Sequence, residues 1–399
     1  MMNEIRRLIL LFIITLIPFT FTGCWGIREM NEIGIITATG VDVEPGGGVR
    51  ITVFSMQPVG NIENPAQRSI AWIGSATGKS LMDASKNLRS ISSRNLVWFQ
   101  NDIVIVGEEM AKVGTREIND FILRNREIRL TGFILVTEGK AMDLMQVPAD
   151  IQSNLYYEIA GILQNANEYA KFYASNIKDY IVSTAVPTQS CVIGKIGYYN
   201  TSMNTFSVPR EEYEKLYFKD AKLGVSYLYG SAVMKDSKMA GWLNGEETRG
   251  FLWITDKNKA GTVSVKSSNG DLSMEIMDLN RKIFLDNANG KITFTVKINV
   301  RGNLSIYTAG GAVEEDKEDY MEKLFEEALI NEMSSVVKIA QDKYKADIFG
   351  FGTYLFERHP DLWRNIKDDW ENIFPEVDVK YDVKVTLKRI GMVTGQAGY

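Results

Sequence analysis

The chain has 399 residues, of which 45% are hydrophobic and 24% charged, and its formal net charge is -5 at pH 7. This length exceeds what a single hydrophobic core usually serves, and the composition lies near the globular average, so we expect two or three folded domains rather than a disordered chain. Lys and Arg are interleaved with Asp and Glu and form no basic block, which argues against a nucleic-acid-binding face.

The amino terminus predicts a signal peptide over residues 1–23. Arg6 and Arg7 precede an apolar stretch over 8–21, the order of a charged and then a hydrophobic region. A helix of that length rises only about 21 Å, less than the roughly 30 Å of bilayer hydrocarbon, so a retained transmembrane anchor is the weaker interpretation.

The segment Phe21-Thr22-Gly23-Cys24 resembles the bacterial lipobox, in which the cysteine thiol receives a diacylglycerol. We therefore predict Cys24 as a lipid attachment site, although Phe21 stands where Leu is usual. The alternative is an ordinary signal peptide that is cut nearby and leaves a free thiol. Removal of Glu4, Arg6 and Arg7 with the signal would change the net charge to -6.

Residues 24–140 alternate strand and helix patterns and predict an α/β domain. The runs 33–41 and 49–57 are rich in β-branched residues, and the segment 44–48 between them, Glu-Pro-Gly-Gly-Gly, is typical of a hairpin turn. Further strands are predicted over 69–73, 102–107 and 129–137, and helices over 80–91 and 115–125.

Residues 141–215 predict a small middle domain or connector. The part from 141 to 178 favours helix, and a strand-like stretch through Val192 follows. Cys191 in this stretch is interpreted as a small buried residue rather than a reactive thiol.

Residues 216–399 predict a carboxy-terminal α+β domain. Four strands precede a long helix over 314–344, a shorter helical segment over 359–374 and a last strand over 377–387. The four strands are predicted over 223–235, 262–266, 272–279 and 291–300. The chain is thus predicted to be an α+β protein of three mixed α/β domains, the last a largely antiparallel sheet packed against long helices.

The segment from Gly74 to Ser80 lies between a predicted strand and a predicted helix, where a phosphate-binding loop would stand. A P-loop has four residues between its glycines, whereas three separate Gly74 from Gly78, so nucleotide binding is disfavoured. We interpret the segment as a turn whose hydroxyl groups cap the helix.

No catalytic or metal site is predicted. His359 is the only histidine, which excludes metal sites with two or three histidines, and Pro360 beside it favours a helix start. The acidic pairs 246–247 and 368–369 are adjacent in sequence, so their side chains diverge and form no acid/base pair.

Aromatic residues and glycines gather near the carboxyl terminus. Trp363, Trp370 and Phe374 are spaced by seven and four, which predicts one apolar helical face; we favour core packing over a partner-binding face. These residues follow the run Ala346-Asp347-Ile348-Phe349-Gly350-Phe351-Gly352 and precede Gly391. Together they closely resemble the carboxy-terminal signature of the Ger(x)C family of spore germination lipoproteins.

Two further blocks resemble the same family. The central block contains Gly230, Trp242 and Glu247, within Gly230-Ser231-Ala232-Val233-Met234-Lys235, Gly241-Trp242-Leu243 and Glu247-Thr248-Arg249-Gly250. The amino-terminal block begins at Cys24-Trp25. There Gly26 and Ile27 stand where the family usually has Asp and Arg. Any specific role that the Asp and Arg charges have in the family is therefore not expected in this chain, whereas the lipid site is unaffected.

The resemblance implies the C subunit of a germinant receptor, with three mixed α/β domains. Such receptors combine a membrane A subunit, a transporter-like B subunit and this lipoprotein in the inner membrane of a dormant spore, and they respond to small nutrients. The resemblance supplies no catalytic residues and assigns no molecular role to the signature residues Trp25, Gly230, Trp242, Glu247, Asp347, Phe349, Gly350, Gly352, Trp363 and Trp370.

We therefore expect a non-enzymatic receptor subunit, anchored to the outer face of the membrane, that contacts A and B subunits. No cofactor is expected beyond the covalent diacylglycerol on Cys24, and no metal or nucleic acid. The alternative is a nutrient-binding lipoprotein that captures the germinant itself. An envelope hydrolase is a third class, against which the single histidine argues.

Overall fold

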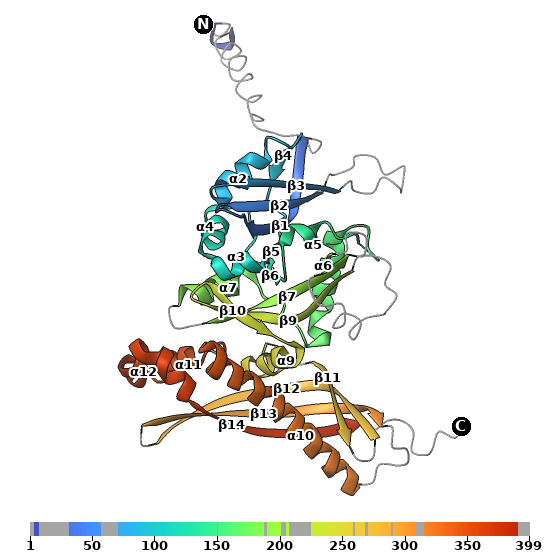
Figure 1. Cartoon of the computed structure of the whole chain (residues 1–399), viewed down its shortest axis with the longest axis vertical. Helices are drawn as coiled ribbons and strands as arrows, with labels where there is room; N and C mark the ends of the chain where they lie inside the picture. Colours follow the sequence, from blue (N-terminus) through green and yellow to red (C-terminus); the bar gives the residue numbers. More distant parts are fainter. Residues whose placement is uncertain are drawn as a thin grey trace, which may run out of the picture.

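The structure is a computed structural model of the whole chain. It describes residues 4–7, 32–56, 71–149, 151–186, 190–200, 205–206, 225–257, 260–267, 270–288, 290–307 and 315–389. Figure 1 shows two β-sheets, one above the other, with helix α9 (Gly245–Thr255) between them. Cys24, Trp25, Gly391 and most of the predicted signal peptide lie outside the described residues.

The first sheet is mixed, with strand order β10-β9-β7-β6-β5-β1-β2-β3 in the described part of the chain; β4 pairs with β1, and β8 pairs with β7. The central strands β1, β5, β6 and β7 are parallel, whereas the strands toward both edges are antiparallel. The bounds are β1 (Ile33–Val43), β2 (Val49–Met56), β3 (Ala71–Gly78), β4 (Asn95–Val97), β5 (Ile103–Gly107), β6 (Phe133–Thr137), β7 (Cys191–Asn200), β8 (Thr205–Phe206), β9 (Val225–Lys235) and β10 (Lys238–Leu243).

Helices cover both faces of this sheet, which explains why its central strands are continuous apolar runs rather than alternating ones. Every residue of β5 is buried. The apolar faces of α2, α3, α4 and α7 form one core with the sheet, and those of α5 and α6 form another on the opposite face. The bounds are α2 (Leu81–Leu88), α3 (Glu108–Val113), α4 (Arg116–Arg124), α5 (Ala141–Met145), α6 (Leu155–Tyr169) and α7 (Ile177–Ala185).

The second sheet has the order β11-β12-β13-β14 and is antiparallel except for the parallel pair β13 and β14. Alternate residues of β13, Phe294, Val296, Ile298 and Val300, are buried in one cluster with the apolar face of helix α10. This period of two is expected where one face of a sheet is covered. The bounds are β11 (Gly261–Ser267), β12 (Gly270–Ala288), β13 (Lys291–Tyr307), β14 (Asp378–Arg389) and α10 (Glu315–Lys338).

The long helix predicted over 314–344 is present but changes its winding. Helix α10 passes into a π-helical turn, η3 (Ile339–Tyr344), and Lys345 then adopts a left-handed φ of 47°. The helical segment predicted over 359–374 is broken into short pieces, so Trp363 and Trp370 do not share one helix. The pieces after η3 are α11 (Phe351–Arg358), α12 (Pro360–Ile366), η4 (Lys367–Asp369), α13 (Trp370–Ile373) and η5 (Phe374–Glu376).

The predicted class of mixed α/β structure is confirmed, including the largely antiparallel carboxy-terminal sheet beside a long helix. The first sheet runs without a break across positions 140/141 and 215/216, because β6 pairs with β7 and β7 pairs with β9. The division of the chain into three domains stays a prediction. Strand β10 and helices α9 and α11 were not predicted from the local pattern.

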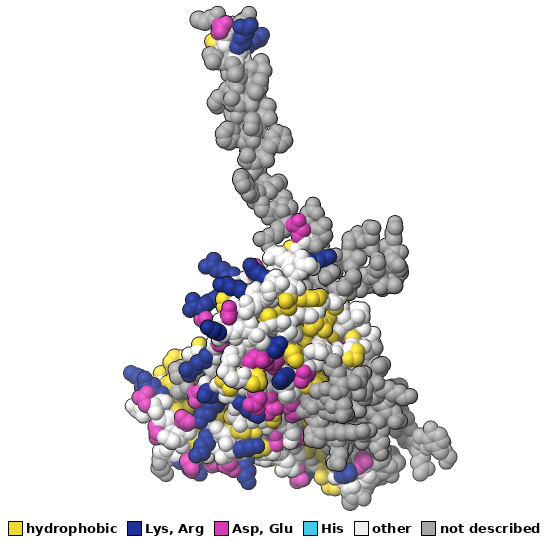
Figure 2. All heavy atoms as spheres, turned by 45° about the horizontal axis from the view of Figure 1, so that its top comes forward, with side chains coloured by type: hydrophobic (Ala, Val, Ile, Leu, Met, Phe, Trp, Pro, Cys, Tyr) yellow, Lys and Arg dark blue, Asp and Glu magenta, His cyan; other side chains and the backbone are white. Residues whose placement is uncertain are grey.

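The surface shows mixed charge. Figure 2 shows Lys and Arg side chains interspersed with Asp and Glu over the face that it displays. No helix of the described residues combines the length and apolarity needed to cross a membrane.

Candidate functional site

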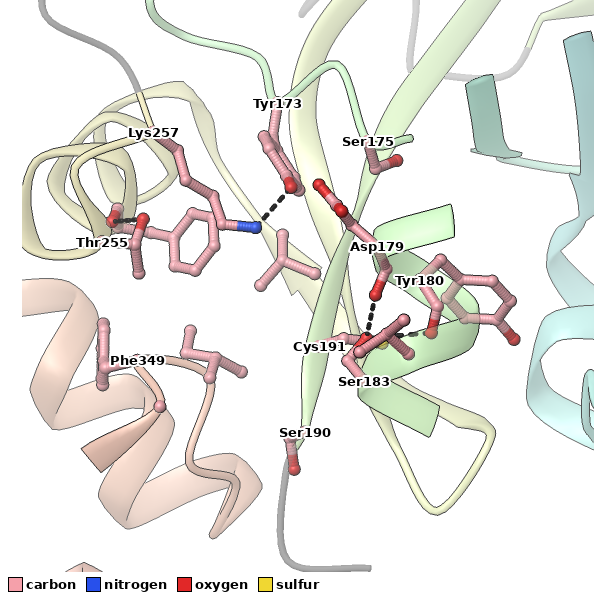
Figure 3. A pocket seen from close by; sticks show the side chains of 15 residues that line it. Tyr173, Ser175, Asp179, Tyr180, Ser183, Ser190, Cys191, Thr255, Lys257 and Phe349 are labelled. Carbon is pink, nitrogen blue, oxygen red and sulfur yellow. Dashed lines mark hydrogen bonds between the residues drawn. The ribbon is translucent and has the colours of Figure 1, made fainter. Parts of the chain in front are cut away.

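A cavity of about 380 Å³ lies where α7 and β7 meet the end of α9 and the turn at 348–350. Figure 3 shows side chains from these four segments facing the cavity. We call it the α7–α9 pocket and define it by Tyr173, Asp179, Ser190, Cys191, Lys257 and Phe349.

Lys257 supplies a positive charge to the pocket. Its ammonium donates a 2.5 Å hydrogen bond to the hydroxyl oxygen of Tyr173 and lies 4.5 Å from the centre of the Tyr173 ring. These contacts fix one N–H of an otherwise flexible side chain and leave two others. The pocket therefore contains an oriented cation.

Asp179, on α7, supplies a negative charge to the same pocket. Its side chain is exposed, and its carboxylate accepts no hydrogen bond from any described residue. Two opposite charges thus border one cavity without forming a described ion pair with each other.

Most hydroxyl groups of the pocket hold its walls together. Ser175 donates to the carbonyl of Ile134 and accepts from the N–H of Gly194, which ties it to the first sheet. Ser183 donates to carbonyls within α7, and Thr255 donates to the carbonyl of Phe251 within α9. Their donor capacity is therefore already used.

Cys191 begins β7 at the wall of the pocket and is partly exposed. Burial raises the pKa of the Cys191 thiol to about 11, with the nearby Ser183 hydroxyl and Lys257 opposing the rise. The thiol stays protonated at neutral pH, as expected of the unreactive residue that the sequence predicted.

The turn at 348–350, which lines the pocket opposite α7 and β7, is organised by Asp347. The carboxylate accepts hydrogen bonds from the N–H groups of Phe349, Gly350, Phe351 and Gly352, at 2.7 to 3.2 Å. It thereby satisfies the free donors at the start of α11, where a negative charge is also favoured by the helix dipole. Burial raises the pKa of Asp347, and these N–H donors oppose the rise.

Two glycines are required for this turn. Gly350 has a left-handed φ of 75°, a conformation that glycine adopts without steric cost. A Cβ on Gly352 would lie 2.9 Å from the Trp370 indole nitrogen and 3.0 Å from the Trp363 ring. The small residue therefore lets α11 approach the two tryptophans.

Trp363 and Trp370 pack against the Asp347 turn and the start of α11, in agreement with their predicted place in the core. The rings of Trp363 and Trp370 meet edge to face, with centres 5.5 Å apart, and Trp370 also contacts Phe374. All three side chains are buried. The structure thus brings together Asp347, Phe349, Gly350, Gly352, Trp363 and Trp370, which are all six of the carboxy-terminal signature residues predicted above.

The central signature residues lie elsewhere, around β9, β10 and α9. Gly230 has a φ of 79°, and a Cβ there would lie 2.4 Å from the carbonyl oxygen of Leu243. Glu247 and Asn244 form a capping box at the start of α9. The Trp242 ring lies 5.2 Å from the Lys195 ammonium.

Tyr344 connects the two signature regions. Its hydroxyl donates a 2.7 Å hydrogen bond to the carbonyl of Trp242, and its ring packs against Gly241. Tyr344 ends the π-helical turn that leads to Asp347. The central block and the Asp347 turn are therefore parts of one packed region, although Phe349 and Gly350 are the only described signature residues that line the α7–α9 pocket.

The other motifs show structural roles. The end of the Gly74–Ser80 segment caps α2: the N–H of Asp83 donates to the Ser80 hydroxyl, and the Leu81 N–H donates to the Glu117 carboxylate. The capping role is thus confirmed for Ser80, but the interpretation of the segment as a turn was wrong for residues 74–78, which belong to β3 and pair with β2. The His359 ring packs near Tyr354, 5.9 Å between centres.

The acidic pair 246–247 does not converge. Glu246 forms an ion pair with Lys171 at 2.8 Å, whereas Glu247 bonds the N–H of Asn244. Among the described residues, no group of three His, Cys, Asp or Glu side chains is placed to hold a metal ion.

Sequence reasoning did not identify the α7–α9 pocket. Tyr173, Asp179, Ser190 and Lys257 come from four separate segments and carry no shared local pattern. The N–H of Ser190 donates to the carbonyl of Asp347, so even the contact between the two walls is long-range. The only local signal was the signature run that contains Phe349 and Gly350.

Two family models match the chain. Residues 26–197 match the model for "Spore germination protein N-terminal domain", and residues 229–391 match "Spore germination B3/ GerAC like, C-terminal". The α7–α9 pocket takes one wall from each matched region.

Relatives are similar over nearly the whole chain. The chain is 26% identical to "Spore germination protein YndF" of Bacillus subtilis (strain 168), over 98% of each chain, and 24% identical to "Spore germination protein KC" of the same strain, over 97% of each. A solved structure, "Crystal Structure of the GerBC protein", is similar in fold with a TM-score of 0.56 at 17% identity, over 88% of this chain and 96% of that one.

Proposed function

The chain belongs to the Ger(x)C family of spore germination proteins, and on this premise we propose that it is the C subunit of a germinant receptor. The observation that carries the proposal is the match of both family models, in order, over two regions that pack together in one fold. Similarity to germination proteins over almost their full length supports the same role.

The proposed location is the outer face of the spore inner membrane, with diacylglycerol on Cys24 as the anchor. Support comes from the short charged and apolar amino terminus, followed by Thr22-Gly23-Cys24. The first described strand, β1, begins only nine residues after Cys24. An anchor at that position would hold the first sheet near the bilayer.

The proposed role is assembly with membrane A and B subunits rather than catalysis. The single histidine packs beside Tyr354, and Glu246 and Glu247 bind separate structural partners. In this proposal the buried signature residues preserve the shape that the A and B subunits contact.

A cysteine exchange tests the anchor. Cys24→Ala should move the protein from the membrane fraction to the soluble fraction of spores and reduce germination with nutrients. Cys191→Ala is the matched control, because it removes the other cysteine and should leave fractionation unchanged. Membrane retention of the Cys24→Ala protein would contradict the lipid anchor.

Copurification tests the assembly. An affinity tag on this chain should recover A- and B-type membrane subunits from detergent-solubilised spore membranes. Recovery of neither subunit, with the tagged chain intact and membrane-bound, would contradict the receptor assignment while leaving the anchor in place.

A further inference from the structure

We propose that the α7–α9 pocket binds a small zwitterion, a free amino acid in chemical class, with its carboxylate toward Lys257 and its ammonium toward Asp179. The proposed function as a receptor subunit does not require any ligand on this chain. The inference therefore goes beyond it and is carried by the pocket alone.

The two charges define the ligand's polar end. The Lys257 ammonium is held by Tyr173 and keeps two N–H donors for a ligand. The Asp179 carboxylate accepts no hydrogen bond from any described residue, so its acceptor sites are open. A molecule that carries one negative and one positive group would pair with both, and charge-assisted hydrogen bonds are the stronger kind.

The remaining polar groups disfavour a sugar or polyol. Such ligands need many donors and acceptors around their hydroxyl groups, but Ser175, Ser183 and Thr255 already donate to backbone carbonyls. The Ser190 side-chain hydroxyl makes no hydrogen bond to another described residue, and the Tyr173 hydroxyl, which accepts from Lys257, keeps its O–H as a donor. Two charges and two hydroxyl groups suit the charged end of an amino acid better than the many hydroxyl groups of a sugar.

The apolar part of the pocket suits a side chain. Phe251 packs edge to face against Tyr173, with ring centres 5.6 Å apart, and lies 6.4 Å from Phe349. Val182 and Ile348 add aliphatic surface. A cavity of about 380 Å³ lies toward the lower end of the roughly 300–1,000 Å³ typical of ligand sites, which favours a small molecule.

Because the pocket lies between separate elements, a bound ligand should stabilise the protein. Asp179 belongs to α7, which packs on the first sheet, whereas Lys257 follows α9, which lies between the two sheets and packs on both β9 and α10. A ligand held by both charges would connect α7 with α9. Binding should therefore stabilise the packing of these two helices and raise the midpoint of thermal unfolding.

The test begins with ligand-observed NMR on the full-length chain in detergent, using the protein L-amino acids one at a time as probes. Calorimetry then measures the best binder, its amide and its des-amino acid. We expect saturable binding of at least one amino acid, and a loss of at least tenfold in affinity when either charged group of the ligand is missing.

Variants assign the binding to the pocket. Lys257→Met and Asp179→Asn should each weaken binding at least tenfold. Lys178→Met is the matched control, because Lys178 is exposed on α7 but does not line the pocket. Val182→Trp places a larger side chain at an exposed position that lines the pocket. It should weaken binding by blocking the pocket without changing its charge.

The outcomes are distinct. Absence of binding by every amino acid up to millimolar concentrations overturns the proposal, as does unchanged affinity in both charge variants. Tighter binding of glucose or sorbitol than of any amino acid also overturns it. Copurification of Lys257→Met with the A and B subunits is measured in parallel, so failure of the pocket and failure of receptor assembly give different results.

Discussion

The indole N–H of Trp370 donates a 3.1 Å hydrogen bond to Oδ2 of Asp347, which lies 23 residues earlier in the chain. The same oxygen accepts from the N–H of Gly352. A single buried carboxylate therefore orders the start of α11 and fixes the ring against which that helix packs. The two residues belong to one structural unit, which explains why they occur in one sequence signature.

Asp347→Asn should destabilise the chain. An amide has one acceptor oxygen, so at least two of the five N–H donors lose their partner, at a cost of about 1–3 kcal/mol each in the free energy of unfolding. Urea unfolding measures the change, with exposed Asp120→Asn on α4 as the control. Equal stability of the two variants would show that the Asp347 contacts are dispensable.

Gly352→Ala should also destabilise, because its Cβ would lie within 3.0 Å of both tryptophans. Crowding in a packed core typically costs about 1–3 kcal/mol. Gly161→Ala on α6 is the matched control, since no atom lies within 4 Å of that Cβ position, and it should stabilise by roughly 0.5–1 kcal/mol. Thermal unfolding of both variants should show opposite shifts.

Arg249→Met should remove a buried connection between α9, α10 and β11. Arg249 pairs with Glu332 and donates to the carbonyl of Thr262, with only 6% of its side chain exposed. Loss of one partner from a buried ion pair costs about 3–5 kcal/mol, because the other charge is left uncompensated.

The double variant Arg249→Met/Glu332→Met tests whether the uncompensated charge causes the loss of stability. It should recover a large part of the lost unfolding free energy, since no unpaired charge then remains. Additive losses in the two single variants, with no recovery in the double, would contradict the account.

Alkylation of Cys191 should be slow and should rise with pH toward about 11, the pKa to which burial raises its thiol. In Cys24→Ala protein Cys191 is the only thiol. At pH 8 its rate with iodoacetamide should be on the order of 100-fold below that of the chain unfolded in guanidinium, where the pKa returns to about 8.5. Equal rates in the two states would show an unshielded thiol.

The local elements and the family could be predicted from the sequence alone. Apolar runs and glycine-rich turns predicted β1, β2 and β5 closely, because strand pairing through a short turn depends on adjacent residues. The signature blocks identified the family, and the described residues of the central and carboxy-terminal blocks pack in one region. The helical face predicted from Trp363, Trp370 and Phe374 was wrong in its geometry, because η4 interrupts the helix, yet their burial was correct.

The order of the strands in the first sheet and the α7–α9 pocket depend on long-range packing. The pairing of β9 with β7 joins strands across a long intervening segment, which local periodicity does not encode. The α7–α9 pocket likewise depends on Lys257 and Asp179, which are 78 positions apart in sequence and line one cavity. Such a site arises from side-chain packing between distant segments, so local sequence patterns do not show that its two charges share a pocket.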